Sequence, residues 1–215
     1  MNDTFQLRLP IQAILFDAFG TLVYIRNRLD PYKRLLTLAT ALGRRPREND
    51  ARWIMSRNIR FADLADDLGV TIPPSTLLEL QEALREEIDS IECYPEVTSC
   101  LLELKQRGYK LGICSNLATP YAERVPELLP FPLDAYTWSF EAGAVKPDAQ
   151  IYRAACDQLA VTPEVVLMIG DTYQADCLGP RREGMAALHL SRDRQSPDPC
   201  FLSQLGELFP LLGHR

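Results

Sequence analysis

Six polar side chains in this sequence have the types and positions that chemistry requires. Each lies at the end of an apolar run or near the start of an expected helix: Asp17, Ser115, Asn116, Lys146, Asp171 and Asp176. They comprise three carboxylates, one hydroxyl, one amide and one ammonium group. Packed cores exclude unpaired charge, so this combination is unlike a core and indicates a site that handles an anion.

The chemistry follows from what each group can do. Asp17 can act as a nucleophile or as one ligand of a hard cation. Asp171 and Asp176 would supply the further negative charge that Mg²⁺ needs. The other groups can donate hydrogen bonds to an anion or neutralise charge that develops during attack: Ser115, Asn116 and Lys146. These roles favour phosphoryl transfer to an aspartate, or another displacement that passes through an aspartyl ester.

A parallel sheet would place these residues at one edge. Short apolar runs predict strands at 11–17, 109–115, 134–138, 165–170 and 185–190. Segments with helical periodicity alternate with them, at 95–107, 120–129 and 148–160. Strands that alternate with helices form an open parallel sheet, and the carboxyl ends of its strands share one crevice. The expected fold class is therefore α/β, a doubly wound parallel sheet with a Rossmann-like core.

A helical stretch interrupts this alternation and shows no convincing strand. Apolar positions at helical spacing predict helices after Pro31, around Trp53, at 61–68 and from Pro74 to about Ile91. We therefore expect two units: a core formed by residues 1–26 and 93–215, and a helical unit formed by residues 27–92. A short helix at the end of the chain is expected to pack on the edge of the core.

Composition excludes several function classes. The 215 residues carry a formal net charge of −6, which argues against a nucleic-acid partner. The first ten residues lack the pattern of a signal peptide, and no apolar run reaches the ~18 residues of a membrane span. We therefore expect a cytoplasmic protein with no membrane partner.

The cysteines and histidines also exclude some kinds of site. The cysteines form no metal-binding pairs, and four of the six lie in apolar or helical contexts that indicate buried, reduced thiols: Cys100, Cys114, Cys156 and Cys177. Because only His189 and His214 are present, we expect neither a histidine-rich zinc site nor a Ser-His-Asp triad.

Charge is divided between the two halves of the helical stretch. Residues 26–60 carry ten basic and three acidic side chains, whereas residues 61–96 carry one basic and ten acidic side chains. The basic half could steer an anionic substrate to the crevice. Alternatively, the two halves are solvated helix faces that attract each other, and we favour this second interpretation.

Four motifs together resemble the haloacid dehalogenase-like (HAD) hydrolase superfamily. They are FDAFGTL at 16–22, CSN at 114–116, AVKPDAQIY at 144–152 and MIGDTYQADCLGPRREGM at 168–185. Each is weak alone, but the four occur in the family's order and span the expected core. The helices at 27–92 look like the family's α-helical cap, which closes over the site.

The resemblance implies a role for each matched residue. Asp17 would be the nucleophile. The substrate anion would be held or neutralised by Thr21, Ser115, Asn116 and Lys146. Mg²⁺ would be bound by Asp17, the backbone carbonyl of Phe19 and Asp171, with support from Asp176. The implied reaction is hydrolysis of a small anionic metabolite that carries a phosphate. The sequence does not indicate the oligomeric state.

Phe19 departs from the pattern of the family's phosphatases. They have an aspartate at this position that protonates the leaving group and later activates water. Phenylalanine cannot transfer a proton, and loss of a general acid or base lowers a rate by about 10²–10⁴-fold. The native protein would then be a slow phosphatase, least impaired on good leaving groups.

Two alternatives follow from Phe19. The family's 2-haloacid dehalogenases carry an aromatic residue here, because a departing halide needs no proton. They need no metal and receive the halide with a cap arginine, for which Arg57 and Arg60 are candidates. The other alternative is a phospholigand-binding protein that has lost catalysis at Phe19.

Overall fold

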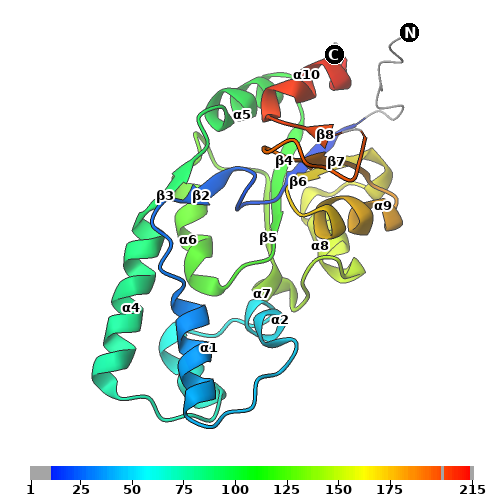
Figure 1. Cartoon of the computed structure of the whole chain (residues 1–215). Coiled ribbons are helices and arrows are strands. Elements are labelled where there is room, and N and C mark those ends of the chain that lie inside the picture. Colours follow the sequence, from blue (N-terminus) through cyan, green and yellow to red (C-terminus); the bar gives the residue numbers. More distant parts are fainter. Residues whose placement is uncertain (1–10, 200, 214–215) are drawn as a thin grey trace.

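The core of the protein is a six-stranded sheet in the order β5-β4-β1-β6-β7-β8, with every neighbouring pair parallel (Figure 1). Its strands are β1 (Ala13–Phe16), β4 (Lys110–Ser115), β5 (Ala135–Trp138), β6 (Val166–Gly170), β7 (Ala186–Leu190) and β8 (Phe201–Leu202). The predicted α/β class and the five predicted strands are confirmed, whereas β8 was not predicted.

This computed structural model describes residues 11–199 and 201–213. The expectations about the first ten residues and His214 therefore lie outside the described residues, as does Cys200. Within the described part, no helix is long and apolar enough to cross a membrane. The four cysteines predicted to be buried thiols are buried and unpaired: Cys100, Cys114, Cys156 and Cys177.

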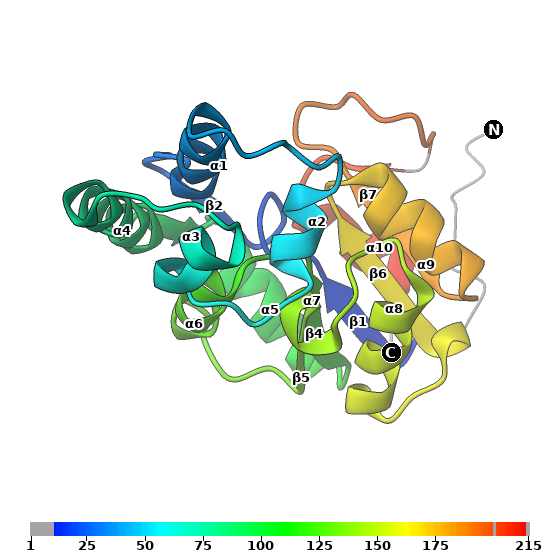
Figure 2. The same cartoon turned by 90° about the horizontal axis from the view of Figure 1, so that it is seen from below.

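Helices and their side chains cover both faces of the sheet. Successive residues of a strand point to opposite faces, so each strand contributes apolar side chains to both. Ile14 and Phe16 of β1 face one hydrophobic cluster, and Ala13 and Leu15 face the other. The first cluster includes residues of α5 (Val97–Gln106), α6 (Thr119–Glu127) and α10 (Leu208–Leu212). The second is covered mainly by α8 (Ala149–Leu159), which lies on the opposite side of the sheet in Figure 2. Two shorter helices, α7 (Ser139–Ala142) and α9 (Gly179–Arg182), complete the core.

The helical segment, defined here as residues 31–89, lies below the carboxyl edge of the sheet in Figure 1. It consists of α1 (Pro31–Ala41), α2 (Asp50–Met55), a 3-10 turn (Phe61–Asp63), α3 (Leu64–Asp67) and α4 (Pro74–Asp89). Its helices share a hydrophobic cluster of their own, which includes Leu35, Phe61 and Leu84. Because this cluster contains one core residue, Ala118, the segment packs against the core as well as on itself.

A two-stranded antiparallel ribbon connects the helical segment to the core. It pairs β2 (Val23–Ile25) with β3 (Ile91–Cys93). The prediction that α4 extends to about Ile91 was wrong, because the helix ends at Asp89 and Ile91 begins a strand. Three residues are too few to show a period of two, and their partner lies far away in the sequence, so the ribbon left no local signal.

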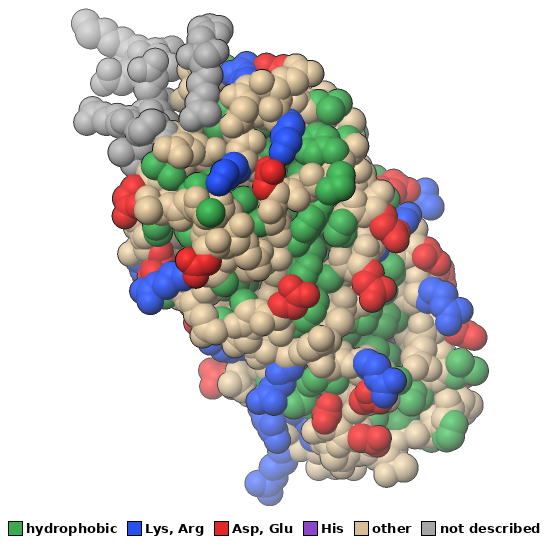
Figure 3. Space-filling model, turned by 180° about the vertical axis from the view of Figure 1, so that it is seen from behind, with side chains coloured by type: hydrophobic (Ala, Val, Ile, Leu, Met, Phe, Trp, Pro, Cys, Tyr) green, Lys and Arg blue, Asp and Glu red, His purple; other side chains and the backbone are tan. Residues whose placement is uncertain are grey.

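Few ion pairs connect the two oppositely charged halves of the helical stretch. Arg26 pairs with Glu92 and Arg60 with Asp63, and both pairs are exposed. Exposed pairs contribute little to stability. On the face shown in Figure 3, acidic and basic side chains are interspersed over most of the surface. The favoured interpretation, attraction between two solvated faces, therefore has only these two ion pairs among the described residues to support it.

Candidate functional site

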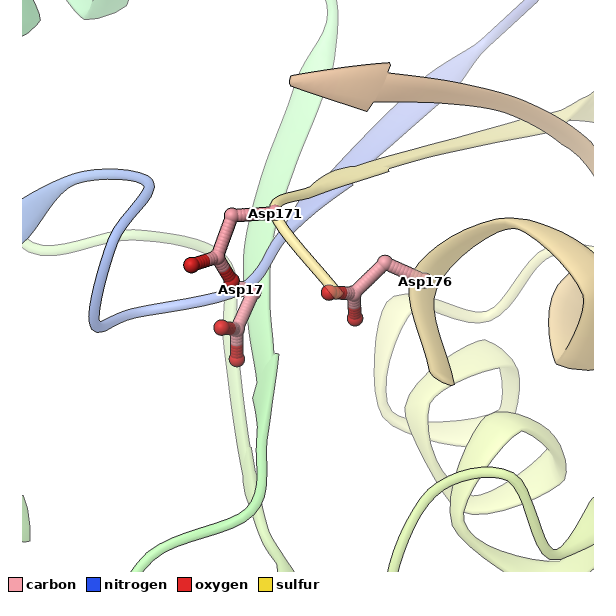
Figure 4. A group of neighbouring side chains, drawn as sticks. All are labelled: Asp17, Asp171 and Asp176. Atoms are coloured by element: carbon pink, nitrogen blue, oxygen red, sulfur yellow. The ribbon is translucent and has the colours of Figure 1, made fainter. Parts of the chain in front are cut away.

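The carboxyl edge of the sheet brings together side chains from three strands. Asp17 directly follows β1, Ser115 is the last residue of β4, and Asp171 directly follows β6. The Asp17 N–H donates a hydrogen bond to the Ile169 carbonyl (2.9 Å), which ties the end of β1 to β6. Figure 4 shows Asp17 and Asp171 projecting from adjacent strand ends toward the same space.

Lys146 lies at the centre of the site and is only 5% exposed. Its Nζ atom is 2.8 Å from Asp17 Oδ1 and 2.6 Å from Asp176 Oδ1. Burial by itself lowers the pKa of the ammonium group, but the charges of the two carboxylates outweigh burial and raise the pKa above its ordinary value. The two carboxylates therefore favour the charged form of Lys146, which contacts the candidate nucleophile.

Asp176 projects from a π-helix (Tyr173–Leu178) and is completely buried. One of its carboxylate oxygens contacts Lys146, and the other accepts a hydrogen bond from the Thr172 N–H (2.9 Å). Burial raises the pKa of the Asp176 carboxyl to about 6, although Lys146 opposes this shift. Both oxygens already have partners, so Asp176 is placed to hold Lys146 and the loop that carries Asp171.

Asp171 is the carboxylate without a cationic partner. It is exposed, and none of the ion pairs among the described residues includes it. Although the residue as a whole is exposed, its carboxyl group is partly desolvated by the surrounding protein, and this desolvation and the nearby charge of Asp17 both raise its pKa above the usual value. Oxygens of Asp17, Asp171 and Asp176 lie within 4.8 Å of one another. The cluster thus holds three carboxylates but only one ammonium group, which contacts Asp17 and Asp176, and this excess of negative charge and hard oxygen atoms fits Mg²⁺.

The loop after Asp17 contributes two further groups. The Phe19 carbonyl accepts no backbone hydrogen bond from the described residues, because the N–H groups of the following turn donate to Ala18 and Val23 instead. The Thr21 hydroxyl is buried and has no partner in the described part of the chain. A buried hydroxyl without a partner is costly, so an oxygen of a bound anion would stabilise it.

Asn116 positions Lys146 through the backbone. Its side-chain Nδ2 donates to the Lys146 carbonyl (2.9 Å), and its Oδ1 accepts from the Lys146 N–H (2.7 Å). The amide group of Asn116 is therefore occupied in holding the loop that carries the ammonium group. The resemblance implies that Asn116 binds the substrate anion. With its side chain in this position, Asn116 would have to bind the anion through its backbone, or its side chain would have to adopt a different arrangement.

A cavity of about 650 Å³ opens beside this site, between the helical segment and the core. Phe19 and Asn116, which are close to Asp17 and Ser115 in the chain, are among its lining residues. Phe19 makes an edge contact with Tyr121 of α6, with ring centroids 5.8 Å apart. Neither Arg57 nor Arg60 lines this cavity: Arg57 lies over the Trp53 ring, and Arg60 pairs with Asp63.

Two residues near the site were missed by the sequence analysis. His189 of β7 bonds through Nε2 to the Asp171 carbonyl (2.9 Å). Arg192 donates to the carbonyls of Gly20 (3.2 Å) and Thr21 (2.8 Å). Both residues hold the backbone of loops that carry candidate site residues. The available signal was their position at the carboxyl end of the predicted strand 185–190, because His189 is its next-to-last residue and Arg192 lies two residues past it.

Polar contacts join the helical segment to the core around the cavity. Arg52 forms an ion pair with Asp148. Thr119 donates to Asn58 (3.3 Å), and Tyr121 donates to Glu87 (2.7 Å). These contacts hold the segment against the carboxyl edge of the sheet.

Comparison with known proteins places the chain among hydrolases. The model of haloacid dehalogenase-like hydrolases matches residues 11–184, which is more than half of the chain. (S)-2-haloacid dehalogenase 4A of Burkholderia cepacia is 26% identical over 94% of this chain and 95% of its own. Phosphoserine phosphatase of Thermus thermophilus is 33% identical over 59% of this chain and 51% of its own.

A solved structure has the same fold. The HAD phosphatase from Thermococcus onnurineus matches with a TM-score of 0.66 and 22% identity, over 94% of this chain and 98% of that one. The relatives thus include both a phosphatase and a dehalogenase.

Proposed function

The chain belongs to the haloacid dehalogenase-like hydrolase family, and within it we propose that the protein is a Mg²⁺-dependent phosphatase of a small anionic substrate. The observation that supports this proposal most strongly is the lack of a cationic partner for the Asp171 carboxylate in the described part of the chain. Asp171 adds a third carboxylate beside Asp17 and Asp176 but has no ion-pair partner among the described residues. A divalent cation would neutralise the excess charge, and a phosphate ester is the substrate class that uses such a cation.

Mg²⁺ would be held by Asp17, Asp171 and the carbonyl of Phe19. When bound, it would draw negative charge from the phosphoryl oxygens and reduce repulsion of an incoming anion. Asp176 would stay behind these ligands, because both its oxygens already have partners. The helical unit expected at residues 27–92, which includes the helical segment, would act as a cap that excludes water from the site.

Asp17 would act as the nucleophile. One of its oxygens attacks phosphorus while the bond to the leaving oxygen breaks, and the electron pair departs with that oxygen. Water then attacks the phosphorus of the aspartyl-phosphate, which releases phosphate and restores the carboxylate. Lys146 Nζ lies 2.8 Å from Asp17 Oδ1, so its positive charge is in place to stabilise the transferred group. The buried Thr21 hydroxyl and Ser115 would donate hydrogen bonds to that group.

Phe19 favours a second candidate, a 2-haloacid dehalogenase. In that reaction Asp17 would displace a halide from carbon, and no proton donor would be needed at position 19. The dehalogenase relative that matches almost the whole chain supports this reading. Against it, the two arginines considered as halide acceptors, Arg57 and Arg60, do not line the cavity.

Parallel assays separate these functions. We expect phosphate release from p-nitrophenyl phosphate in Mg²⁺, with none after chelation and none from Asp17→Asn. Asp66→Asn, on an exposed site of α3, is the matched control and should keep native turnover. Chloride release from 2-chloropropanoate that survives chelation would replace the phosphatase with the dehalogenase. Tight phosphate binding without turnover of either substrate would reject both enzymes in favour of a binding protein.

A further inference from the structure

The cavity beside Phe19 has the size of a ligand pocket. Its volume of about 650 Å³ lies within the roughly 300–1,000 Å³ typical of small-molecule sites. Its lining residues include Phe19 and Asn116, which are close to Asp17 and Ser115 in the chain, and Leu36, Ile54 and Met55 of α1 and α2. A group attached to a phosphate at Asp17 would therefore extend into this space.

The buried charges of the cavity wall already have partners. Glu87 accepts hydrogen bonds from the Leu29 and Asp30 N–H groups and from the Tyr121 hydroxyl. Asp50 is paired with Arg44. The other charged lining residues are exposed: Arg28, Asp30 and Lys33. The buried wall thus offers a ligand mainly apolar contact, and a second charged group on the substrate would find a partner only among the exposed residues.

Phe19 restricts the leaving group on independent grounds. Without a general acid, the departing oxygen must leave as an anion. A phenol has a pKa of about 10, as in tyrosine, whereas an alkyl alcohol lies near the roughly 15.7 of water. A leaving group whose pKa is lower by about 6 units departs more easily, and this gain is large enough to offset the 10²–10⁴-fold loss of rate that the missing general acid causes.

We propose that the substrate is a phosphomonoester of a phenol, with its aromatic ring in this cavity against Phe19 and Leu36. This inference rests on the proposed phosphatase function and names its substrate class. Asp17 forms a bond to phosphorus, the bond from phosphorus to the aryl oxygen breaks, and the phenolate takes a proton from solvent. Hydrolysis of the aspartyl-phosphate by water then releases phosphate and one proton.

A substrate series on the native protein tests this proposal with Mg²⁺ present. Cyclohexyl phosphate and phenyl phosphate have six-membered rings but differ in leaving-group pKa, so we expect kcat/KM to be at least about 10²-fold higher for phenyl phosphate. 1-Naphthyl phosphate has a similar leaving group and more apolar area, so its KM should be about 10-fold lower than that of phenyl phosphate.

Variants of the cavity wall test where the ring lies. Leu36→Gln should raise the KM for 1-naphthyl phosphate about 10-fold and leave inhibition by inorganic phosphate unchanged. Leu42→Gln is the matched control, because Leu42 follows the same helix but is 49% exposed and does not line the cavity. If Leu36→Gln does not fold, as judged by circular dichroism, Met55→Gln replaces it.

The outcomes distinguish this inference from the proposed function. If p-nitrophenyl phosphate is not hydrolysed at all, the phosphatase function fails. If it is hydrolysed but cyclohexyl phosphate matches phenyl phosphate, the aryl substrate class is rejected and the function stands. An unchanged KM in both folded wall variants would likewise overturn the placement of the ring.

Discussion

Replacing Gly20 with alanine should move the Asp171 carboxylate and thereby weaken the metal site. A Cβ atom at Gly20 would lie 2.5 Å from the carboxyl carbon of Asp171. Gly20 also has a φ of +79°, a left-handed conformation that costs alanine about 1–2 kcal/mol. Gly108 has nearly the same φ, +78°, but a Cβ there would meet no atom within 4 Å. Gly108→Ala is therefore a control with the same backbone strain and no contact.

The size of the effect follows from the distance. Carbon atoms in ordinary contact are about 3.5–4.0 Å apart, so the Asp171 carboxyl must move by roughly 1 Å. A displacement of that size at a reacting centre lowers a rate by about 10²-fold. We expect Gly20→Ala to lose about 10²-fold in kcat/KM for p-nitrophenyl phosphate, and Gly108→Ala to keep native values while both variants are similarly destabilised.

Urea denaturation and Mg²⁺ calorimetry separate the two effects. Urea midpoints measure the shared backbone strain, and isothermal titration calorimetry without substrate measures Mg²⁺ affinity. Affinity should fall in Gly20→Ala alone. Equal Mg²⁺ affinity and equal kcat/KM in the two variants would refute the argument that the position of Asp171 defines the site.

Three further predictions concern groups around the cavity and Lys146. Tyr32→Phe removes a buried hydroxyl that has no hydrogen-bond partner among the described residues, so the free energy of unfolding in urea should stay equal or rise by about 1 kcal/mol. Hydrogen bonds from Arg44 hold the pKa of the Asp50 carboxyl below its usual value, so their stabilising effect is present above about pH 4 and disappears as the pH falls through the lowered pKa. Asp50→Asn should therefore destabilise by about 1–3 kcal/mol at pH 7, this loss should shrink as the pH falls through the lowered pKa, and a loss that does not change with pH would contradict this. Asn116→Ala removes two hydrogen bonds to the Lys146 backbone and should lower thermal stability by about 2 kcal/mol and reduce kcat, whereas an unchanged kcat would show that Lys146 is positioned without them.

Strand ends explain why the site was largely predictable. The runs before Asp17 and Asp171 are apolar and four or five residues long, so their burial in a parallel sheet follows from composition alone. A parallel sheet then brings the residues after each strand to one edge. The structure does place Asp17, Asp171 and Asp176 together, with Lys146 between two of them.

Contacts to backbone atoms explain what could not be predicted. His189 and Arg192 bond to carbonyl groups, which every residue carries, so no pattern of side chains marks their partners. The engagement of both Asp176 oxygens also depends on the turn that brings the Thr172 N–H close. The β2–β3 ribbon is set by pairing between residues such as Ile25 and Ile91, which are far apart in sequence.

The central claim is that Asp17 becomes phosphorylated, and rapid-quench mass spectrometry of the native protein tests it most directly. Because Phe19 offers no general base for the second step, the aspartyl-phosphate should accumulate when p-nitrophenyl phosphate is mixed with the Mg²⁺-loaded protein and quenched in acid. We predict one phosphoryl group on the peptide that contains Asp17, and none after chelation. Phosphate release with no phosphorylated Asp17 peptide, or with the phosphoryl group on another residue, would contradict the account.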